Sequence, residues 1–145
     1  MDICNYRKLH FKEIISILEE KDICSLGISS KTSLDITPML FAFEYENENI
    51  NFFLISSNTK IKDDLELVCI YLDNSISNFY RDSYQTVLAK GKPEIITNTP
   101  LKNHILSLFR KKYHKSLKDL ISCSDLQFIK IPIESITAKE YEYTF

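Results

Sequence analysis

Residues 56–62 carry the side chains in this chain that are best suited to hold a phosphate group. The run Ser-Ser-Asn-Thr-Lys-Ile-Lys offers hydroxyls, an amide and two ammonium groups directly after an aromatic segment. Hydroxyls, lysine and the backbone N–H groups of a helix start are what a phosphate monoester needs. Polar runs of this kind also form ordinary turns, so spacing alone leaves both a phosphate loop and a simple turn open.

Histidine and cysteine form no compact catalytic or metal-binding pattern. The three histidines, His10, His104 and His114, are far apart, and no G-x-S-x-G turn accompanies them. The cysteines have no C-x-x-C spacing, so we expect no zinc site and no other metal. Cys24 and Cys69 lie within apolar runs, which predicts small buried thiols in a reducing, cytoplasmic setting.

The basic run at residues 110–115 follows the apolar face of a predicted helix. Cations there complement the negative end of the helix dipole, which favours a solvated helix end over a nucleic-acid patch. Lys plus Arg number 18 against 20 for Asp plus Glu, a formal charge of −2 that also argues against nucleic acid as the partner. No apolar run approaches the roughly 20 residues of a membrane span, so no membrane contact is expected.

The elements that must position these residues form one predicted domain, residues 1–145. The chain is 44% hydrophobic and 26% charged, as in soluble globular domains. Apolar residues at helical spacing predict helices over residues 11–18 and 101–109. Runs rich in β-branched and aromatic residues predict strands over residues 23–28, 36–45, 50–55, 67–72, 84–96, 126–133 and 136–143. Several hairpins and two added helices indicate an α+β fold with a barrel-like sheet.

Glycine, asparagine and phenylalanine set local expectations within these strands. Gly91 interrupts a long strand and predicts a bulge or sharp bend, while Asn in residues 46–49 suits a tight hairpin. Alternation places Phe41 and Phe43 on one face of their strand, and Phe52 and Phe53 on opposite faces of theirs. Core packing is the favoured role of these rings; a flat-ligand site or a dimer interface is the alternative.

Five runs in order along nearly the whole chain resemble one known family. These are TPMLFAFEY (37–45), FFLISSNTK (52–60), YQTVLAKGKPE (84–94), FRKKY (109–113) and IPIESITAK (131–139). The first run is similar to that family's "P-x-x-F-x-Y-E" strand, and the second to its aromatic strand with a phosphate loop. The third is similar to a strand ending near glycine. The fourth is similar to an "L-x-x-K-Y" helix end, and the fifth to a final "I-x-I-x-x-I-T-G-K". The family is the split-barrel flavoproteins, which includes pyridoxamine 5′-phosphate oxidases and nitroimidazole-resistance proteins.

The resemblance implies a six-stranded antiparallel split barrel that forms a homodimer, with flavin mononucleotide (FMN) at each end of the interface. It implies a flavin-dependent oxidoreductase, nitroreductase-like, that exchanges electrons with a small molecule and needs no catalytic acid or base. We expect the two-fold interface to bury more than about 2,000 Å². The implied cofactor-binding residues are Thr37, Pro38, Met39, Leu40, Leu54, Ile55, Ser57, Asn58, Thr59, Lys60, Lys62 and Thr86.

The chain departs from the pyridoxamine phosphate oxidases at three places. Thr37 and Thr59 stand where the oxidases carry phosphate-binding arginines, and residues 140–145 contain no arginine to hold pyridoxamine phosphate. A true pyridoxamine phosphate oxidase is therefore not expected. The alternative to an enzyme is a non-enzymatic flavin- or haem-binding module of the same fold, in which a histidine would ligate iron.

We predict that Lys60 anchors the FMN phosphate, with Lys62 as the substitute if the loop is shifted. A charge-assisted contact contributes roughly 1.5–3 kcal/mol, so Lys60→Ala should weaken FMN binding about ten- to a hundredfold. Riboflavin, which lacks the phosphate, should bind both proteins alike. Titrations of the two flavins measure this. Equal losses for both would mean that Lys60 acts through folding, and no loss would place the phosphate elsewhere.

Overall fold

The strands of this protein pair into one antiparallel ring, against which two helices pack. The computed structural model describes residues 2–56, 61, 67–77, 82–114 and 126–144. In chain order the elements are β1 (Asp2–Lys8), α1 (Phe11–Glu20), β2 (Ile23–Ser29), β3 (Leu34–Glu46), β4 (Asn49–Ser56), β5 (Val68–Ser77), β6 (Asp82–Gly91), β7 (Glu94–Ile96), α2 (Thr99–Tyr113) and β8 (Gln127–Thr144).

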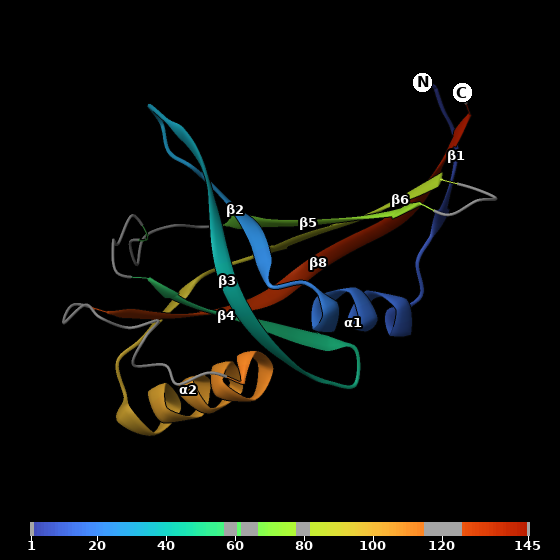
Figure 1. The fold of residues 1–145 in the computed structure, drawn as a ribbon. Coiled ribbons are helices and arrows are strands. Elements are labelled where there is room, and N and C mark those ends of the chain that lie inside the picture. The colour runs from blue at the N-terminus through green and yellow to red at the C-terminus, as the bar shows by residue number, and fades with distance from the viewer. Residues whose placement is uncertain (1, 57–60, 62–66, 78–81, 115–125, 145) are drawn as a thin grey trace.

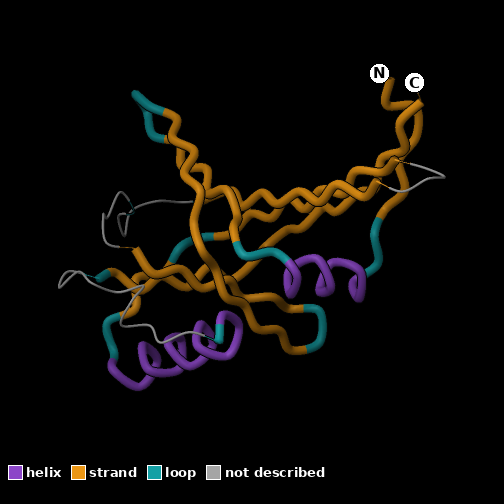
Figure 2. Tube along the Cα trace, viewed as in Figure 1, coloured by secondary structure: helices purple, strands orange, loops and turns teal. Residues whose placement is uncertain are grey.

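Six strands close the ring in the order β2–β3–β4–β8–β6–β5 and back to β2, with an antiparallel pair at each step. This closure confirms the predicted α+β split barrel. β1 and β7 pair with β8 outside the ring. In Figures 1 and 2 the strands β5, β6, β8 and β1 run out together as an arm that carries both chain ends, and the β2–β3 hairpin projects in a different direction.

The long strand β8 joins the two halves of the barrel. It pairs with β4 as far as Pro132 and with β6 from Ile133 onward. The prediction of two strands, 126–133 and 136–143, is wrong here, because the chain does not break between them. Instead the register of β6 against β8 shifts, so that Lys90 faces Ser135 and Gly91 faces Ile133. A bulge of this kind bends a strand without ending it.

Gly91 is required where β6 meets the turning point of β8. A Cβ at this position would lie 2.2 Å from the carbonyl oxygen of Pro132 and 2.9 Å from Cγ2 of Ile131. Only a residue without a side chain permits this approach. The predicted bend at Gly91 is therefore confirmed, and the single predicted strand 84–96 divides there into β6 and β7.

The helix α1 packs its apolar face on the barrel interior. Ile14, Ile15 and Leu18 are buried with the inward side chains of the strands. At its start, the Arg7 guanidinium of β1 pairs with Glu13 at 2.7 Å and with Glu140 of β8 at 2.8 Å. The Glu13 carboxylate accepts hydrogen bonds from the Arg7 guanidinium and from the backbone N–H of His10. Both bonds favour the charged form, so the pKa of Glu13 falls to about 2.

The helix α2 covers the outside of the barrel at β3, β4 and β8. Asn98 caps its start by accepting a hydrogen bond from the Leu101 N–H. Its buried Ile105 and Phe109 join a cluster with Phe53 on the outer side of β4. Phe41 and Phe52 lie instead in the barrel core. The predicted opposite faces of Phe52 and Phe53, and core packing as their role, are both confirmed.

The "K-Y" end of α2 seals the edge of β3 just beyond Leu40, which pairs with Ile23, the first residue of β2. The Tyr113 hydroxyl donates to the Phe41 carbonyl at 2.5 Å and lies 3.0 Å from the carbonyl of Asp22. It also accepts from the Phe41 N–H at 3.2 Å. Phe41 pairs with Leu54 of β4 on one side, and on the β2 side a phenol takes the place of a strand, because an unpaired buried backbone group would be costly.

Some elements were not predicted from the sequence. The N-terminal residues form β1, and residues 73–77 and 82–83 extend the β5–β6 hairpin beyond the predicted strand ends. The predicted hairpin turn is present, with Asn47 in the left-handed region at φ 56°. No helix within the described ranges is long and apolar enough to cross a membrane.

We predict that Gly91→Ala destabilises the fold severely. The new methyl group meets backbone, which cannot move aside as a side chain would, so the loss should reach about 3 kcal/mol or more. Gly27→Ala is the control, since its Cβ meets only Cys69 Cβ at an ordinary 3.5 Å. Urea unfolding measures both. Equal small effects would show that β6 and β8 can separate at this point.

Candidate functional site

Of the predicted cofactor residues, Pro38 and Thr86 lie on one surface, the outer side of β3, β2, β5 and β6. On these strands Leu26, Ile70, Val87 and their alternate neighbours are buried in the barrel, so the residues between them face outward. We call this surface the outer face; it comprises Ile23, Ser25, Gly27, Leu34, Ile36, Pro38, Cys69, Tyr71, Asp73, Tyr84, Thr86 and Leu88. Register links Pro38 to Ser25, Ser25 to Tyr71 and Tyr71 to Leu88 in one row across the four strands.

The four predicted residues of β3 have different surroundings. Thr37 and Pro38 are exposed, whereas Met39 and Leu40 are half-buried. Met39 packs on the barrel core and Leu40 on the cluster beneath α2. Pro38 is therefore the member of this group that the outer face presents to a ligand.

The predicted residues of β4 lie directly beside this segment. Leu54 pairs with Phe41 and is fully buried in the barrel, while Ile55 packs against the α2 cluster. Neither side chain reaches the outer face. The predicted phosphate-binding residues Ser57, Asn58, Thr59, Lys60 and Lys62 lie outside the described residues.

Thr86 is held apart from the β3 group within one subunit. It is half-buried on β6, where its neighbours across the sheet are Asp73 on β5 and Lys139 on β8. Two strands, β2 and β5, separate β6 from β3. At about 4.8 Å per strand spacing, this is a distance of roughly 14 Å.

A hydrogen-bonded group of three side chains lies on the outer face beside Thr86. The Tyr84 hydroxyl donates to Oδ2 of Asp73 at 2.6 Å, and the Tyr71 hydroxyl is 3.3 Å from that of Tyr84. Burial, followed by the bond to Asp73, raises the pKa of Tyr84 above its ordinary value. Tyr84 therefore remains a hydrogen-bond donor throughout the neutral range.

A cavity of about 370 Å³ opens between the β3 residues and Thr86. Ile23, Ser25, Tyr71 and Asp73 line it, together with Lys21 at the end of α1. Ile23 and Ser25 are the register partners of Leu40 and Pro38. The cavity thus lies between the two groups of predicted residues, and its volume falls within the range of small-molecule sites. Asp22 and Leu72 complete the lining, so two carboxylates, two hydroxyls and one ammonium group lie beside two apolar side chains and can orient a ligand with a polar edge.

A sequence profile of the family described as pyridoxamine 5′-phosphate oxidase matches residues 11–140. The chain belongs to this family. No curated protein matches the sequence closely enough to show a relationship. Membership was predicted from the five ordered runs, and this prediction is confirmed.

Solved structures of the same fold include several flavin-binding proteins. A FAD-binding protein from Mesorhizobium loti has a TM-score of 0.69 and 18% identity, covering 96% of this chain and 98% of that one. A Bacteroides thetaiotaomicron protein assigned to 5-nitroimidazole antibiotic resistance has a TM-score of 0.69 and 22% identity, covering 97% and 92%. The FAD-binding protein from Mycobacterium smegmatis has a TM-score of 0.65 and 12% identity, covering 95% and 100%.

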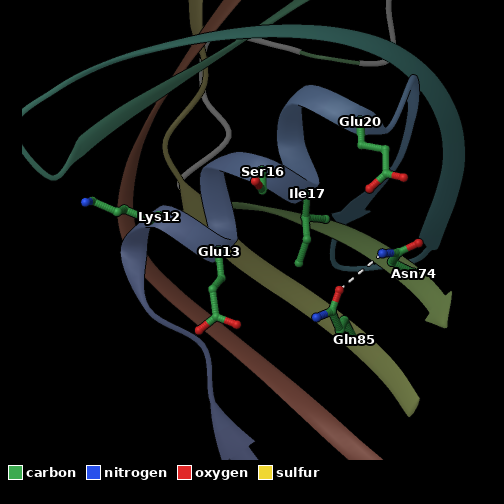
Figure 3. A pocket seen from close by; sticks show the side chains of 7 residues that line it. All are labelled: Lys12, Glu13, Ser16, Ile17, Glu20, Asn74 and Gln85. Carbon is green, nitrogen blue, oxygen red and sulfur yellow. Dashed lines mark hydrogen bonds between the residues drawn. The ribbon is translucent and has the colours of Figure 1, made fainter. Parts of the chain in front are cut away.

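The present protein has a second cavity, of about 390 Å³, on the inner side of the arm beneath α1 (Figure 3). Its polar residues Asn74 and Gln85 bond to each other at 3.1 Å, and Gln85 also donates to Glu140. Gln85 points inward, whereas its neighbour Thr86 points outward. This cavity is therefore separated from the outer face by the sheet itself.

Among the described residues, His104 and Cys24 lie away from the outer face. Nε2 of His104, on α2, lies 2.8 Å from Oε2 of Glu44, on β3. Burial raises the pKa of the Cys24 thiol to about 12, which makes it unreactive. No cluster of three metal-ligating side chains occurs in the described part of the chain. Cys24 is buried as predicted, while Cys69 is only half-buried on the outer face.

Sequence reasoning missed the Tyr71–Asp73–Tyr84 group. Its members meet because Asp73 pairs with Thr86, two positions along β6 from Tyr84, which pairs with Ser75. The predicted strand ended at residue 72, so the pairing of Asp73 with β6 was not expected. The signal that could have found it is the tyrosine–x–aspartate spacing at the start of a long hairpin.

Proposed function

We propose that this protein is a homodimeric FMN-binding oxidoreductase that passes electrons to a small acceptor. The observation that carries this proposal is the outer face, which presents Pro38 on β3 and Thr86 on β6. Between these strands lies a cavity of about 370 Å³, lined mainly by residues of β2 and β5. Membership of a flavin-associated family supports it, as does the likeness in fold to FAD-binding proteins. FMN is chosen over FAD because the run at residues 56–62 suits a terminal phosphate.

The residues on this surface fit a flat, partly apolar cofactor. Pro38, Ile36 and Leu88 offer apolar contact for a ring system, and Tyr71 and Thr86 offer hydroxyls for its polar edge. When bound, the flavin supplies two-electron hydride chemistry. The chain's own residues then bind and orient the ring, and they exclude water from its face. The Tyr84 hydroxyl, fixed by Asp73, holds a proton at the border of this site.

The substrate differs from that of a pyridoxamine phosphate oxidase. Residues 140–145 contain no arginine, whereas those enzymes end in an arginine-bearing motif that holds pyridoxamine phosphate. Without that charge-assisted contact, a phosphorylated substrate loses its main anchor. We therefore propose an uncharged, small electron acceptor such as a nitroaromatic compound.

A two-fold partner completes the site in this proposal. The outer face exposes Leu34 and Ile36, which are 73% and 70% exposed, on the projecting β2–β3 hairpin. Exposed apolar residues grouped in this way mark an interaction surface. Because about 14 Å separates Thr86 from β3 in one subunit, one flavin ring contacts both only when Thr86 comes from the other protomer.

The absorbance spectrum of the purified protein tests the proposed function. We expect a yellow protein, or a colourless one that gains a flavin spectrum and thermal stability when FMN is added. Preference for FAD would change the cofactor but keep the flavin site. Failure to bind either flavin contradicts the proposal, and a haem Soret band on reconstitution without flavin uptake would establish the haem-binding alternative.

We predict that Leu88→Arg converts the dimer to a monomer. Leu88 lies in the middle row of the outer face, so an arginine would bring two cations together across the two-fold axis. Tyr45→Arg is the control, since Tyr45 is 50% exposed but lies on the part of β3 beside α1 and α2. Light scattering at micromolar concentration measures both. This interface would be excluded if the wild-type protein were a monomer, or if the Leu88→Arg variant remained a dimer.

A further inference from the structure

The strand β3 continues past the start of β2 and leaves part of its backbone edge without a strand partner. β2 pairs with β3 only as far as Leu40, which faces Ile23, whereas β3 runs on to Glu46. β4 takes the other edge from Phe41 to Glu46. The edge of residues 42–46 that faces away from β4, which we call the open edge, has no strand beside it in the described part of the chain. Such an edge is a template for pairing with another chain.

Alternation along the strand shows which groups the open edge presents. The N–H and C=O of Phe41 both point away from β4, because both bond to the Tyr113 hydroxyl. Backbone direction repeats at every second residue of a strand, so the N–H and C=O groups of Phe43 and Tyr45 point the same way. On this edge these groups have no hydrogen-bond partner among the described residues.

A cavity of about 410 Å³ lies across the open edge. Residues 42–45 of β3 line it, together with Glu19 near the end of α1 and Leu108 of α2. The two helices stand on opposite faces of β3, because Phe43 packs on the barrel core with α1 and Ala42 packs on the cluster beneath α2. A cavity lined from both faces of a strand has to pass across its edge, and β4 occupies the other edge. The unpaired backbone groups thus border a space large enough for a ligand.

The two ends of the open edge differ in charge. Beside Phe41, the exposed Lys111 and the half-buried Lys112 line the cavity, and Lys112 donates to the Phe41 carbonyl at 3.3 Å. At the far end, the β3–β4 hairpin exposes Glu46 and Glu48. A bound segment is therefore favoured when it is acidic at the Phe41 end and basic at the hairpin end.

Two carboxylates also line the cavity and offset part of the lysine charge. Oε2 of Glu44 lies 2.8 Å from Nε2 of His104, so this carboxylate already has a partner. Glu19 is exposed near the end of α1. The lining groups that remain available to a ligand are then two ammonium groups and one carboxylate, which favours an anionic chain end over a cationic one.

We propose that the open edge binds the C-terminal segment of a partner protein as an added antiparallel strand. Main-chain hydrogen bonds to Phe43 and Tyr45 supply affinity, and alternate side chains of the segment contact the α1 side or the α2 side of the cavity. The Tyr113 hydroxyl already pairs with Phe41, so the added strand stops there. This activity goes beyond the proposed flavin site, which lies on the outer face.

The direction of the added strand follows from the charges. An antiparallel strand runs from Glu46 toward Phe41 and ends with its α-carboxylate beside Lys111 and Lys112. Basic residues earlier in the segment then lie next to Glu46 and Glu48. A parallel strand would instead bring an ammonium terminus to the two lysines.

Binding of a synthetic peptide tests the hydrogen bonds. The probe is Lys-Arg-Thr-Val-Thr-Leu with a free C-terminal carboxylate and an N-terminal fluorescent label, and fluorescence anisotropy measures its affinity. In the proposed register the last leucine faces Ala42, the threonine before it faces Phe43 and the valine faces Glu44. N-methylation of that threonine removes a hydrogen bond to the Phe43 carbonyl and should weaken binding about tenfold or more. N-methylation of the valine, whose N–H points away from β3, is the matched control and should have little effect.

Two further comparisons test the position of the chain end. The same peptide with a C-terminal amide should bind about tenfold more weakly, because a charge-assisted contact is lost. Lys111→Ala should lower the affinity of the acid peptide but not that of the amide peptide. Arg110→Ala, which removes a neighbouring cation that does not line the cavity, should affect neither.

Three results would overturn the proposal. One is the absence of binding at about 1 mM protein, the range of the weakest specific complexes. Another is equal binding of the two N-methylated peptides, which would show that the backbone of β3 is not involved. The third is equal binding of the acid and amide peptides to the wild-type protein, which would show that the cavity does not hold a chain end.

Discussion

The close approach of Gly91 to Pro132 is the contact on which the rest of this structure depends. One strand, β8, completes both halves of the barrel, and it changes partner from β4 to β6 at this point. The ring closes only if β6 ends against the backbone of β8, where a Cβ would lie 2.2 Å from a carbonyl oxygen. The absence of one side chain thus allows the sheet to turn back on itself, and the positions of β2, β3 and β5 follow from that closure.

The two helices then divide the outside of the barrel into a covered and an uncovered part. Over β4 the outward Phe53 is fully buried beneath α2, and Tyr113 occupies the free backbone edge of β3. Over β2, β5, β6 and the hairpin end of β3 no described element covers the outer side of the sheet, so Ile36 and Leu88 remain exposed. The chain therefore uses one side to stabilise its fold and leaves the other available for a ligand and a second subunit.

Much of this architecture was predictable, because the signals were local. Period-two runs located the ring strands, Asn47 marked its hairpin, and Gly91 marked the corner. The arm was not predictable, since residues 73–77 and 82–83 are polar and carry no apolar alternation. In the arm the strands face water or a polar network on their inner side, where Gln85 and Glu140 are buried but bonded to each other.

The candidate site was predictable only in part, for a different reason. Resemblance located Thr37–Leu40, Leu54, Ile55 and Thr86 on the chain, but strand register decides which of them face outward, and it turns Leu54 into the core. Tyr84 and Tyr113 owe their environments to residues farther along the chain. No local pattern reports that Tyr113 reaches the edge of a strand or that Tyr84 meets a carboxylate.

Electron density for the protein crystallised with FMN tests the central claim most directly. If the outer face holds the cofactor, the isoalloxazine ring lies at a two-fold interface, against Pro38 of one protomer and within contact of Thr86 of the other. FMN bound to an isolated protomer, or seated in the cavity beneath α1 while the outer face stays open to solvent, would contradict that claim.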